Sequence, residues 1–430
     1  MKSNSQLLYS KDDASTDPAV AIQGPLAGKI VAIVHPAWHS CGSHSVFVSQ
    51  ARAYQSLGAK VLSIALASSP GCVNGTRGSK AYFSATGDLN ASIRLFAGMP
   101  LRHVVNAAFP RACKEWLHGN HAAMQIEVSR LTPLPEALAS IPQIDLIHCN
   151  HFFSMPVAAR LRARYGCPVV LDTHDVQAHQ YVLRNRGSLT LPPAASFEDM
   201  LAIECEAMRG ADILVHLNRE EEAVFQKILP DKSHALLYPA VGAMPAGTGG
   251  GPPIIVASAN YPNFLGLTWF LREVLPLAPS AAVQIFGNID RMLRWRAPIL
   301  FKAHAGRFRG KAEAKELDCA YRDSAAVLLP ATAGHGISIK TIEALSCGAP
   351  LVATPLAFRG FPAGANKLPN VIIADRADGF AAALRSLQGS GTPAHIDRAS
   401  SPTRRYYEQH FSFSTYRSSL LAIAQKALAV

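Results

Sequence analysis

The stretch AAVLLPATAGHGISIKTIEALSCGAPLVAT, residues 325–354, decides the fold of this chain. Two short apolar runs, 325–330 and 349–354, flank a helical pattern that Gly348 ends. A strand, a helix and a second strand in this order are typical of a βαβ unit, whose strands run parallel in one sheet. Such folds bind ligands at the carboxyl ends of their strands, so the stretch predicts a ligand site just after residue 330.

The rest of the chain repeats this alternation of short apolar runs and helical patterns. The expected strands are 29–34, 60–66, 145–149, 168–173, 211–217, 234–239, 253–258, 282–287, 307–310, 325–330, 349–354 and 370–374. A Gly- and Pro-rich segment separates two series, which predicts an α/β chain of two doubly wound Rossmann-like domains facing each other across a cleft. The predicted parts are a flexible leader at 1–27, a first domain at 28–241, a linker at 242–253, a second domain at 254–402 and a C-terminal helix at 403–430.

The composition restricts the class of partner. The chain has 430 residues, and its net charge of +11 suggests an anionic partner, such as nucleic acid, a membrane surface or a phosphorylated small molecule. No basic stripe with interleaved aromatic residues is present, so nucleic acid is the weakest of these. The eight cysteines are scattered without zinc spacing, so no metal site is predicted. The lack of a long apolar run or signal-peptide pattern predicts a cytoplasmic chain.

The loop and helix inside the opening stretch have residues suited to an anion. Gly334 and Gly336 allow the backbone to approach a ligand closely, and Ser338 is placed to cap the following helix. The amides of the first helical turn and the Lys340 ammonium favour a diphosphate. Glu343 lies on the same helical face, where its carboxylate could accept bonds from a ribose diol. The alternative is an ordinary capped helix with a surface Lys–Glu pair.

The pattern G-x-G-x-S-x-K-x-x-E-A-L-x-x-G-x-P-L-V-A-T at 334–354 closely resembles the donor-binding signature of family 4 glycosyltransferases, which have the GT-B fold. VASANYPNFLGLTWFLREVLP at 256–276 resembles the start of the second domain in some bacterial members. LIHCNHFF, PVVLDTHDV and LLYPAV in the first domain follow in the family's order. The resemblance covers about residues 28–400.

The resemblance implies a retaining, metal-independent transferase that needs no cofactor and takes a nucleotide-diphosphate sugar as donor. It assigns the acceptor to the first domain and the donor to the second, and implies that the C-terminal helix crosses back to the first domain. The donor contacts that it implies around the glycine loop are His335, Gly336, Ile337 and Ser338. A front-face departure assisted by the phosphate is favoured, with Lys340 stabilising the developing charge.

This sequence departs from the family at two places. Members commonly carry a glutamate where His335 stands, and that glutamate is usually assigned to the donor sugar ring. Many members also place an arginine and a lysine in the first turn of the second domain, where SANYPNFLG has neither. We therefore assign the cation to Lys340, with Asn260 and Asn263 as neutral donors and Arg309 as a helper.

The candidate acceptor side lies after strands of the first domain. His174 and Asp175 follow the strand 168–173, where a neutral imidazole could bond a sugar hydroxyl or the donor phosphate and Asp175 could orient it. The alternative is a turn in which Asp175 caps the next helix. Gly42 and Ser43 resemble the family's glycine loop near the donor phosphates; the alternative is a plain strand-to-helix connection.

The favoured function is a glycosyltransferase that acts on a saccharide or lipid-linked acceptor in bacterial surface polysaccharide or glycolipid synthesis. The alternatives are a non-catalytic nucleotide-sugar-binding partner protein, which His335 keeps open, and another GT-B enzyme such as a nucleotide-sugar epimerase. The segment 101–124 mixes basic and bulky apolar residues. It suggests either peripheral contact with the inner face of a membrane or an ordinary amphipathic helix.

Overall fold

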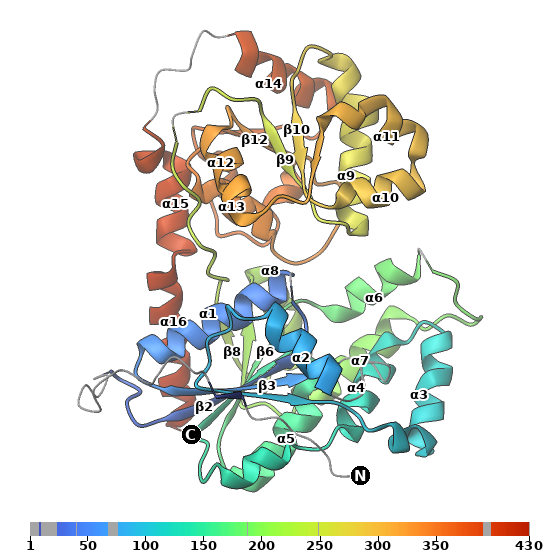
Figure 1. Cartoon of the computed structure of the whole chain (residues 1–430), viewed down its shortest axis with the longest axis vertical. Coiled ribbons are helices and arrows are strands. Elements are labelled where there is room, and N and C mark those ends of the chain that lie inside the picture. Colours follow the sequence, from blue (N-terminus) through green and yellow to red (C-terminus); the bar gives the residue numbers. More distant parts are fainter. Residues whose placement is uncertain are drawn as a thin grey trace. The chain divides into compact units, whose positions relative to one another are not determined.

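The computed structural model divides the chain into two units, Met1–Pro239 with Tyr416–Val430, and Ala240–Thr415. Each unit is built around one sheet (Figure 1). The residues that the structure describes are 8–9, 24–39, 41–67, 76–186, 188–247, 249–389 and 397–429. Most of the predicted leader therefore lies outside the described residues.

The first unit contains an eight-stranded sheet in the order β1-β4-β3-β2-β5-β6-β7-β8. Its strands are β1 Leu8–Tyr9, β2 Ile30–Pro36, β3 Lys60–Leu66, β4 Ile93–Ala97, β5 Leu146–Asn150, β6 Val169–Asp172, β7 Ile213–His216 and β8 Ser233–Leu236. All neighbours are parallel except β1, which runs antiparallel to β4. The chain moves outward from β2 to β4 and restarts on the other side with β5, so the order reverses between β2 and β5.

The helices of the first unit connect these strands. They are α1 Gly42–Ser56, α2 Thr76–Ala85, η3 Leu101–Val105, α3 Ala108–Leu117, α4 His121–Leu131, η4 Glu136–Ser140, η5 Phe152–Ser154, α5 Met155–Tyr165, α6 Gln177–Asn185, α7 Phe197–Met208, α8 Arg219–Ile228 and α16 Phe413–Leu428. Alternation along β5 separates two faces: Ile147 and Cys149 pack in the core with Leu161 of α5, whereas His148 bonds Tyr54 of α1. Helices α1 and α5 therefore cover opposite faces of the sheet (Figure 1).

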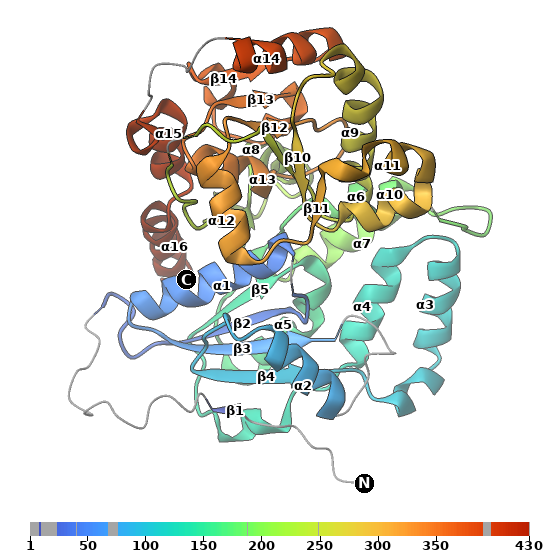
Figure 2. The ribbon, with the colours of Figure 1, turned by 45° about the horizontal axis from the view of Figure 1, so that its top comes forward.

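The second unit contains a six-stranded, fully parallel sheet in the order β11-β10-β9-β12-β13-β14. Figure 2 shows β12, β13 and β14 side by side. Its strands are β9 Ile254–Val256, β10 Gln284–Phe286, β11 Phe308–Gly310, β12 Val327–Leu329, β13 Leu351–Ala353 and β14 Val371–Ile373. Each falls within one of the strands expected from the sequence. Here the order reverses between β9 and β12.

The helices of the second unit follow the same alternation. They are α9 Tyr261–Trp269, η6 Phe270–Val274, η7 Leu275–Leu277, α10 Ile289–Arg296, α11 Pro298–His304, η8 Ala305–Arg307, α12 Ala314–Asp323, α13 Ile339–Ser346, η9 Pro355–Phe358, η10 Ala365–Lys367, α14 Ala377–Gly389, η11 Arg398–Ser400 and α15 Pro402–His410. Both units are doubly wound, which confirms the predicted fold class for each of them. The segment 403–430 forms two helices, α15 in the second unit and α16, whose residues 416–430 belong to the first.

Candidate active site

Two strained histidines stand at the carboxyl ends of β5 and β6. His151 has φ 64° and His174 has φ 63°, and they are the non-glycine residues with positive φ in the described part of the chain. Their rings stack with centroids 3.9 Å apart and planes 6° from parallel. A left-handed residue of this kind costs roughly 1–3 kcal/mol and persists only where its surroundings hold it, most often at functional sites.

The His174 side chain is almost fully buried and tightly held. Its Nε2 lies 2.9 Å from Asn150 Oδ1, and its backbone amide donates to Asp172 Oδ1 at 3.1 Å. Burial, helped by the nearby histidines, lowers the pKa of His174 well below its usual value. The imidazole is therefore neutral at neutral pH, as the sequence analysis predicted for a hydrogen-bonding role.

A buried polar cluster that the sequence analysis missed lies behind His174. Gln50 of α1 places Nε2 3.0 Å from Asn150 Oδ1, 3.1 Å from Asp172 Oδ2 and 3.1 Å from His148 Nε2. The Tyr54 hydroxyl bonds His148 Nδ1 at 2.8 Å. Burial lowers the pKa of His148 to about 3 and raises the pKa of Asp172 to about 7. Polar residues that end buried strands, as Asn150 and Asp172 do, are the signal that could have found this cluster.

Asp175 is half-buried next to a second group of carboxyls. Burial and the nearby Asp175 raise the pKa of Glu221 well above its usual value. Asp175 does not cap α6. The Glu204 carboxylate accepts from the amides of Gln177 and Ala178, each at 3.0 Å, and burial raises its pKa to about 8. The capping alternative for Asp175 is thus wrong, because a carboxylate from α7 satisfies those amides.

The loop after β2 reaches the stacked histidines. Helix α1 begins at Gly42, and Ser43 Oγ lies 3.3 Å from His151 Nε2. Trp38 packs edge-on against His151 with ring centroids 4.8 Å apart. The structure thus brings Ser43 and His174 of the predicted site together around His151.

In the second unit, the predicted anion site forms a glycine loop ahead of α13. Gly334 has φ 117° and Gly336 has φ 72°, and Ser338 accepts a bond from the Thr341 amide as the helix cap. The Lys340 ammonium lies 3.0 Å and 3.3 Å from the two Glu343 oxygens. This pair matches the Lys–Glu contact expected on the helix surface.

Glu343 has a second partner that the sequence analysis missed. Its Oε2 also accepts from the Tyr321 hydroxyl at 3.0 Å, and Tyr321 is fully buried in the second unit. The carboxylate is therefore anchored to α12, while the Lys340 side chain is one-third exposed. A ligand at the loop would meet Lys340 as the movable member of this group.

Arg359 is a cation at the glycine loop that the sequence analysis also missed. Its Nη2 donates to the His335 carbonyl at 3.2 Å, and the same nitrogen lies 3.1 Å from where a Cβ on Gly334 would stand. Arg359 follows β13, which pairs with β12, the strand that precedes the loop. The pairing of β12 with β13 explains why Arg359 contacts the glycine loop, although the two are far apart in the sequence.

The two asparagines after β9 mainly bond to their own turn. Asn260 caps α9 by accepting from the Asn263 amide at 2.9 Å, and Asn263 Nδ2 donates to the Ser258 carbonyl at 3.0 Å. Pro262 in this turn would lie 3.4 Å from a Cβ on Gly334, so the turn and the glycine loop meet.

Arg309 stands apart from the other predicted donor-site residues. It lies in the edge strand β11, three strand positions from β12 and so roughly 14 Å away at the usual spacing. Its Nη1 bonds the carbonyl of Gly306 at 3.4 Å. The other predicted donor residues of the second unit gather near the start of α13, whereas Gly42 and Ser43 lie at the start of α1 in the first unit.

The second unit also matches a known protein family. Residues 252–389 match the family model described as "Glycosyl transferases group 1". The second unit therefore contains a domain of the group 1 glycosyltransferase type. The match contains both the glycine loop and α13, and it confirms the family resemblance found in the sequence. Among curated proteins, no sequence matches the chain.

Solved structures of glycosyltransferases share the fold over nearly the whole chain. Sucrose-phosphate synthase from Thermosynechococcus elongatus has a TM-score of 0.61 at 13% identity, covering 93% of this chain and 99% of that one. HepE from Anabaena in complex with UDP has a TM-score of 0.61 at 13% identity, covering 93% and 100%. The α,α-trehalose 6-phosphate synthase from Burkholderia multivorans has a TM-score of 0.58 at 15% identity, covering 94% and 99%. The chain therefore has the GT-B fold of these enzymes.

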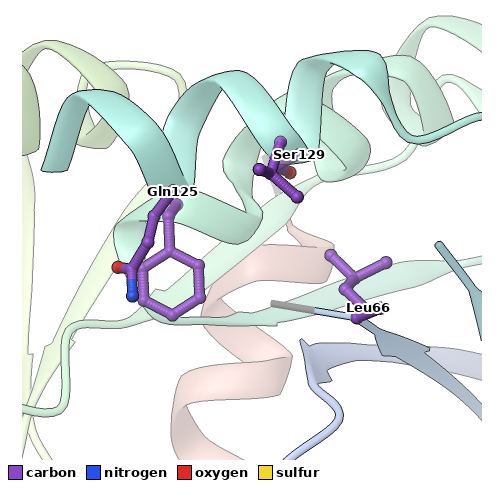
Figure 3. Close-up of a pocket in the computed structure, with 6 residues that line it drawn as sticks. Leu66, Gln125 and Ser129 are labelled. Carbon is purple, nitrogen blue, oxygen red and sulfur yellow. The ribbon is translucent and has the colours of Figure 1, made fainter. Parts of the chain in front are cut away.

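A small pocket of the first unit has none of the predicted site residues in its lining, although Phe153, which stacks on His151, is part of it. Leu66, at the end of β3, and Gln125 and Ser129, on α4, line it (Figure 3). Its empty volume of about 250 Å³ includes open solvent and is below the roughly 300–1,000 Å³ usual for ligand sites. Within the described ranges, no group of three or more His, Cys, Asp or Glu could hold a metal, and no helix is long and apolar enough to cross a membrane.

Proposed function

We propose that this protein is a glycosyltransferase that moves a sugar from a nucleotide-diphosphate sugar to a saccharide or lipid-linked acceptor, with retention, in bacterial surface polysaccharide or glycolipid synthesis. The observation that carries the proposal is the glycine loop at 334–338, which opens α13 inside the matched family domain. The structural likeness to HepE in complex with UDP supports a nucleotide as part of the donor.

The donor's diphosphate binds at the start of α13. The amides of the first turn and the Lys340 ammonium stabilise its charge, and that charge grows as the sugar leaves. Lys340 gives up part of its contact with Glu343, which keeps its bond to Tyr321 and accepts bonds from the ribose. Asn260 and Asn263 supply neutral donors from the adjoining turn.

The acceptor hydroxyl is held at the carboxyl edge of the first sheet. His174 accepts a hydrogen bond from it, and Asp175 adds negative charge nearby. Because its pKa is so low, His174 is a poor base and orients the hydroxyl without removing its proton. As the new bond forms on the face that the diphosphate leaves, the hydroxyl proton turns from His174 to a departing phosphate oxygen and is transferred to it.

The first test is thermal stabilisation of the full chain by UDP-, GDP-, ADP- and CMP-sugars. A ligand that binds the folded state raises the melting temperature by mass action. We expect one nucleotide class to stabilise the protein, and Lys340→Ala and Glu343→Ala to abolish the shift. Lys302→Ala, an exposed cation on α11, is the matched control. A shift that survives both site substitutions would place the donor elsewhere.

A non-catalytic nucleotide-sugar-binding protein is the second candidate. His335 stands where the family usually has a glutamate, and its carbonyl is tied to Arg359. The purified chain with its nucleotide sugar separates the two candidates. Release of the nucleotide diphosphate with an acceptor, or slowly with water, supports the enzyme, whereas binding without any release supports the second candidate.

We further propose that the first unit touches the inner face of a membrane. Large apolar side chains are exposed on η3, on α3 and in the loop before α7; they are Leu101, Val105, Trp116, Leu117, Leu189 and Leu191. The Leu191 amide donates to the Leu117 carbonyl, so the loop lies against the end of α3. Arg102, Arg111 and Lys114 are exposed on the same helices. Apolar and basic side chains together suit an anionic lipid surface.

Sedimentation with lipid vesicles tests this surface. The protein should bind vesicles that contain phosphatidylglycerol more strongly than neutral phosphatidylcholine vesicles. Trp116→Ser with Leu189→Ser should reduce binding, and Ile299→Ser, an exposed apolar residue on α11, should not. Equal binding by all the variants would remove the membrane from the proposal.

A further inference from the structure

Three buried side chains connect His174 to a fixed hydrogen-bond acceptor. Asp172, Gln50 and Asn150 are each 0% exposed and come from β6, α1 and β5. Gln50 links the two others, because its Nε2 lies 3.1 Å from Asp172 Oδ2 and its Oε1 lies 2.9 Å from Asn150 Nδ2. Asn150 Oδ1 lies 2.9 Å from His174 Nε2. These contacts form a continuous chain from a carboxylate to the imidazole.

The chemistry of these groups decides which atom donates and which accepts in each hydrogen bond of this series. Above its raised pKa of about 7 the Asp172 carboxylate is ionised and only accepts hydrogen bonds, so the amide nitrogen of Gln50 must then face Asp172. The carbonyl oxygen of Gln50 is then left to accept from the amide nitrogen of Asn150. The Val34 carbonyl, 3.5 Å from that nitrogen, favours the same orientation. The oxygen of Asn150 must therefore face His174.

We propose that Asp172, Gln50 and Asn150 are positioning residues that fix the tautomer of His174, with the proton on Nε2 and a free lone pair on Nδ1. Nε2 must donate, since the Asn150 oxygen at 2.9 Å is an acceptor and Asp172 Oδ1, 3.9 Å away, is a carboxylate oxygen. No described residue bonds Nδ1. The lone pair on Nδ1 then accepts the bond from the acceptor hydroxyl; this last step rests on the proposed function, whereas the tautomer does not.

The backbone and the ring stack keep the imidazole in this orientation. The positive φ of His174 and the bond from its amide to Asp172 fix the start of the side chain. Stacking on His151 fixes the plane of the ring. Turning the ring over would remove Nε2 from Asn150 and leave a buried carbonyl oxygen with fewer donors, which is costly. The strained backbone of His174 thus helps to hold the ring with Nδ1 available to a ligand.

Histidine-labelled protein allows the tautomer to be measured directly. Long-range proton–nitrogen spectra of the full chain, labelled with ¹⁵N-histidine, distinguish a protonated ring nitrogen from an unprotonated one. His174→Asn identifies the His174 signals, because asparagine tolerates positive φ. We expect Nε2 to be protonated and Nδ1 unprotonated, by about tenfold over the other tautomer. The opposite tautomer in the unaltered protein would overturn the proposal.

Two substitutions test whether the chain of amides sets that preference. Gln50→Met keeps the length of the side chain but removes the amide that orients Asn150. Asn150→Leu removes the oxygen that accepts from His174. Both substitutions should bring the two tautomers of His174 toward equal amounts. Asn370→Leu is the control, a buried amide of the second unit that bonds Thr403. If Asn150→Leu does not fold, Gln50→Met and the unaltered spectrum still decide. An unchanged tautomer in Gln50→Met would show that the amides do not position His174.

The spectra need no nucleotide sugar. A confirmed tautomer in a protein that binds no nucleotide would leave this inference standing and reject the proposed donor. Thermal stabilisation by a nucleotide sugar together with the opposite tautomer would support the proposed donor and reject this inference.

Discussion

The carboxyl edges of the two sheets are built in opposite ways. In the first unit the polar groups are buried and hydrogen-bonded, and His174 is neutral and strained. In the second unit a glycine loop leads to Lys340, whose side chain is 33% exposed and already paired with Glu343. The first edge is organised before any ligand arrives, whereas the second has a charged group that can exchange one partner for another. Substitutions at the first edge should therefore lower the rate of sugar transfer, whereas substitutions at the second should lower the affinity for the donor.

The largest expected effect is on the rate of sugar transfer and follows from replacing His174. His174→Asn keeps the backbone conformation but removes the Nδ1 acceptor, so sugar transfer should fall by about 100-fold because the hydroxyl is no longer oriented. The thermal shift with the nucleotide should stay. Transfer rates with the nucleotide sugar found in the binding panel measure this.

His179→Asn, on α6, is the control and should stay within a few-fold of the unaltered protein. The comparison between the edges would break if His174→Asn lost nucleotide binding and transfer together.

Glu343 allows the two roles of the second edge to be separated. Glu343→Ala leaves the buried Tyr321 hydroxyl without its acceptor and should cost about 1–3 kcal/mol of unfolding free energy, measured in urea. Glu343→Gln keeps an acceptor for Tyr321 and should lose less. Lys340→Ala should retain the stability but lower donor affinity by about tenfold. Equal stability of the two Glu343 variants would show that the bond to Tyr321 contributes little.

The buried groups of the first edge predict a dependence of stability on pH. The folded-state pKa of His174 lies well below that of the unfolded chain, so the unfolded state binds the extra proton and stability falls as pH drops below about 6.5. Asp172, whose pKa is raised to about 7, acts in the opposite direction between about pH 4 and 7. Removing His174 and removing Asp172 should therefore change the slope of unfolding free energy against pH in opposite directions.

Urea unfolding between pH 5 and 7.5 checks this sign. His174→Asn should make the fall in stability with acid shallower by up to about 1.4 kcal/mol per pH unit, and Asp172→Asn should make it steeper. The same direction of change in both variants would contradict the assigned protonation states.

The smallest effect concerns two helix caps, one in each unit. Ser338→Ala and Ser196→Ala each remove a serine that accepts from the first turn of its helix, at α13 and α7, and each should cost about 1 kcal/mol of unfolding free energy. Only Ser338→Ala should also weaken nucleotide binding, because only that cap lies at the proposed donor site. A similar nucleotide shift in both variants would separate the donor from α13.

Local patterns made the fold and half of the candidate site predictable. Short, mainly apolar runs marked the strands of the second sheet other than β11, and the spacing of Gly334, Gly336 and Ser338 marked the start of α13. Strand β4 was missed because it alternates buried and half-buried residues and shows no continuous apolar run. Its neighbour β3 is apolar almost throughout and was found.

The buried cluster of the first unit could not be predicted in the same way. Gln50 meets Asn150 and Asp172 across 100 and 122 positions of the chain, so no short motif contains the contact. Glu204 likewise reaches α6 from another helix and takes the place expected of Asp175. Single polar residues at strand ends were visible, but their partners depend on which helices cover the sheet.

The last helix has a consequence for how the protein is made. Tyr416, Leu420 and Ala424 of α16 are buried and belong to the first unit, although the whole second unit precedes them in the chain. During translation, residues 30–236, which contain seven strands of the first sheet, are therefore made well before the helix that packs with them. Until α16 is made, its contacts in the first unit are missing, in contrast to the usual order in which an N-terminal domain is complete before the next one follows. A fragment that stops at Pro239 would lack these contacts.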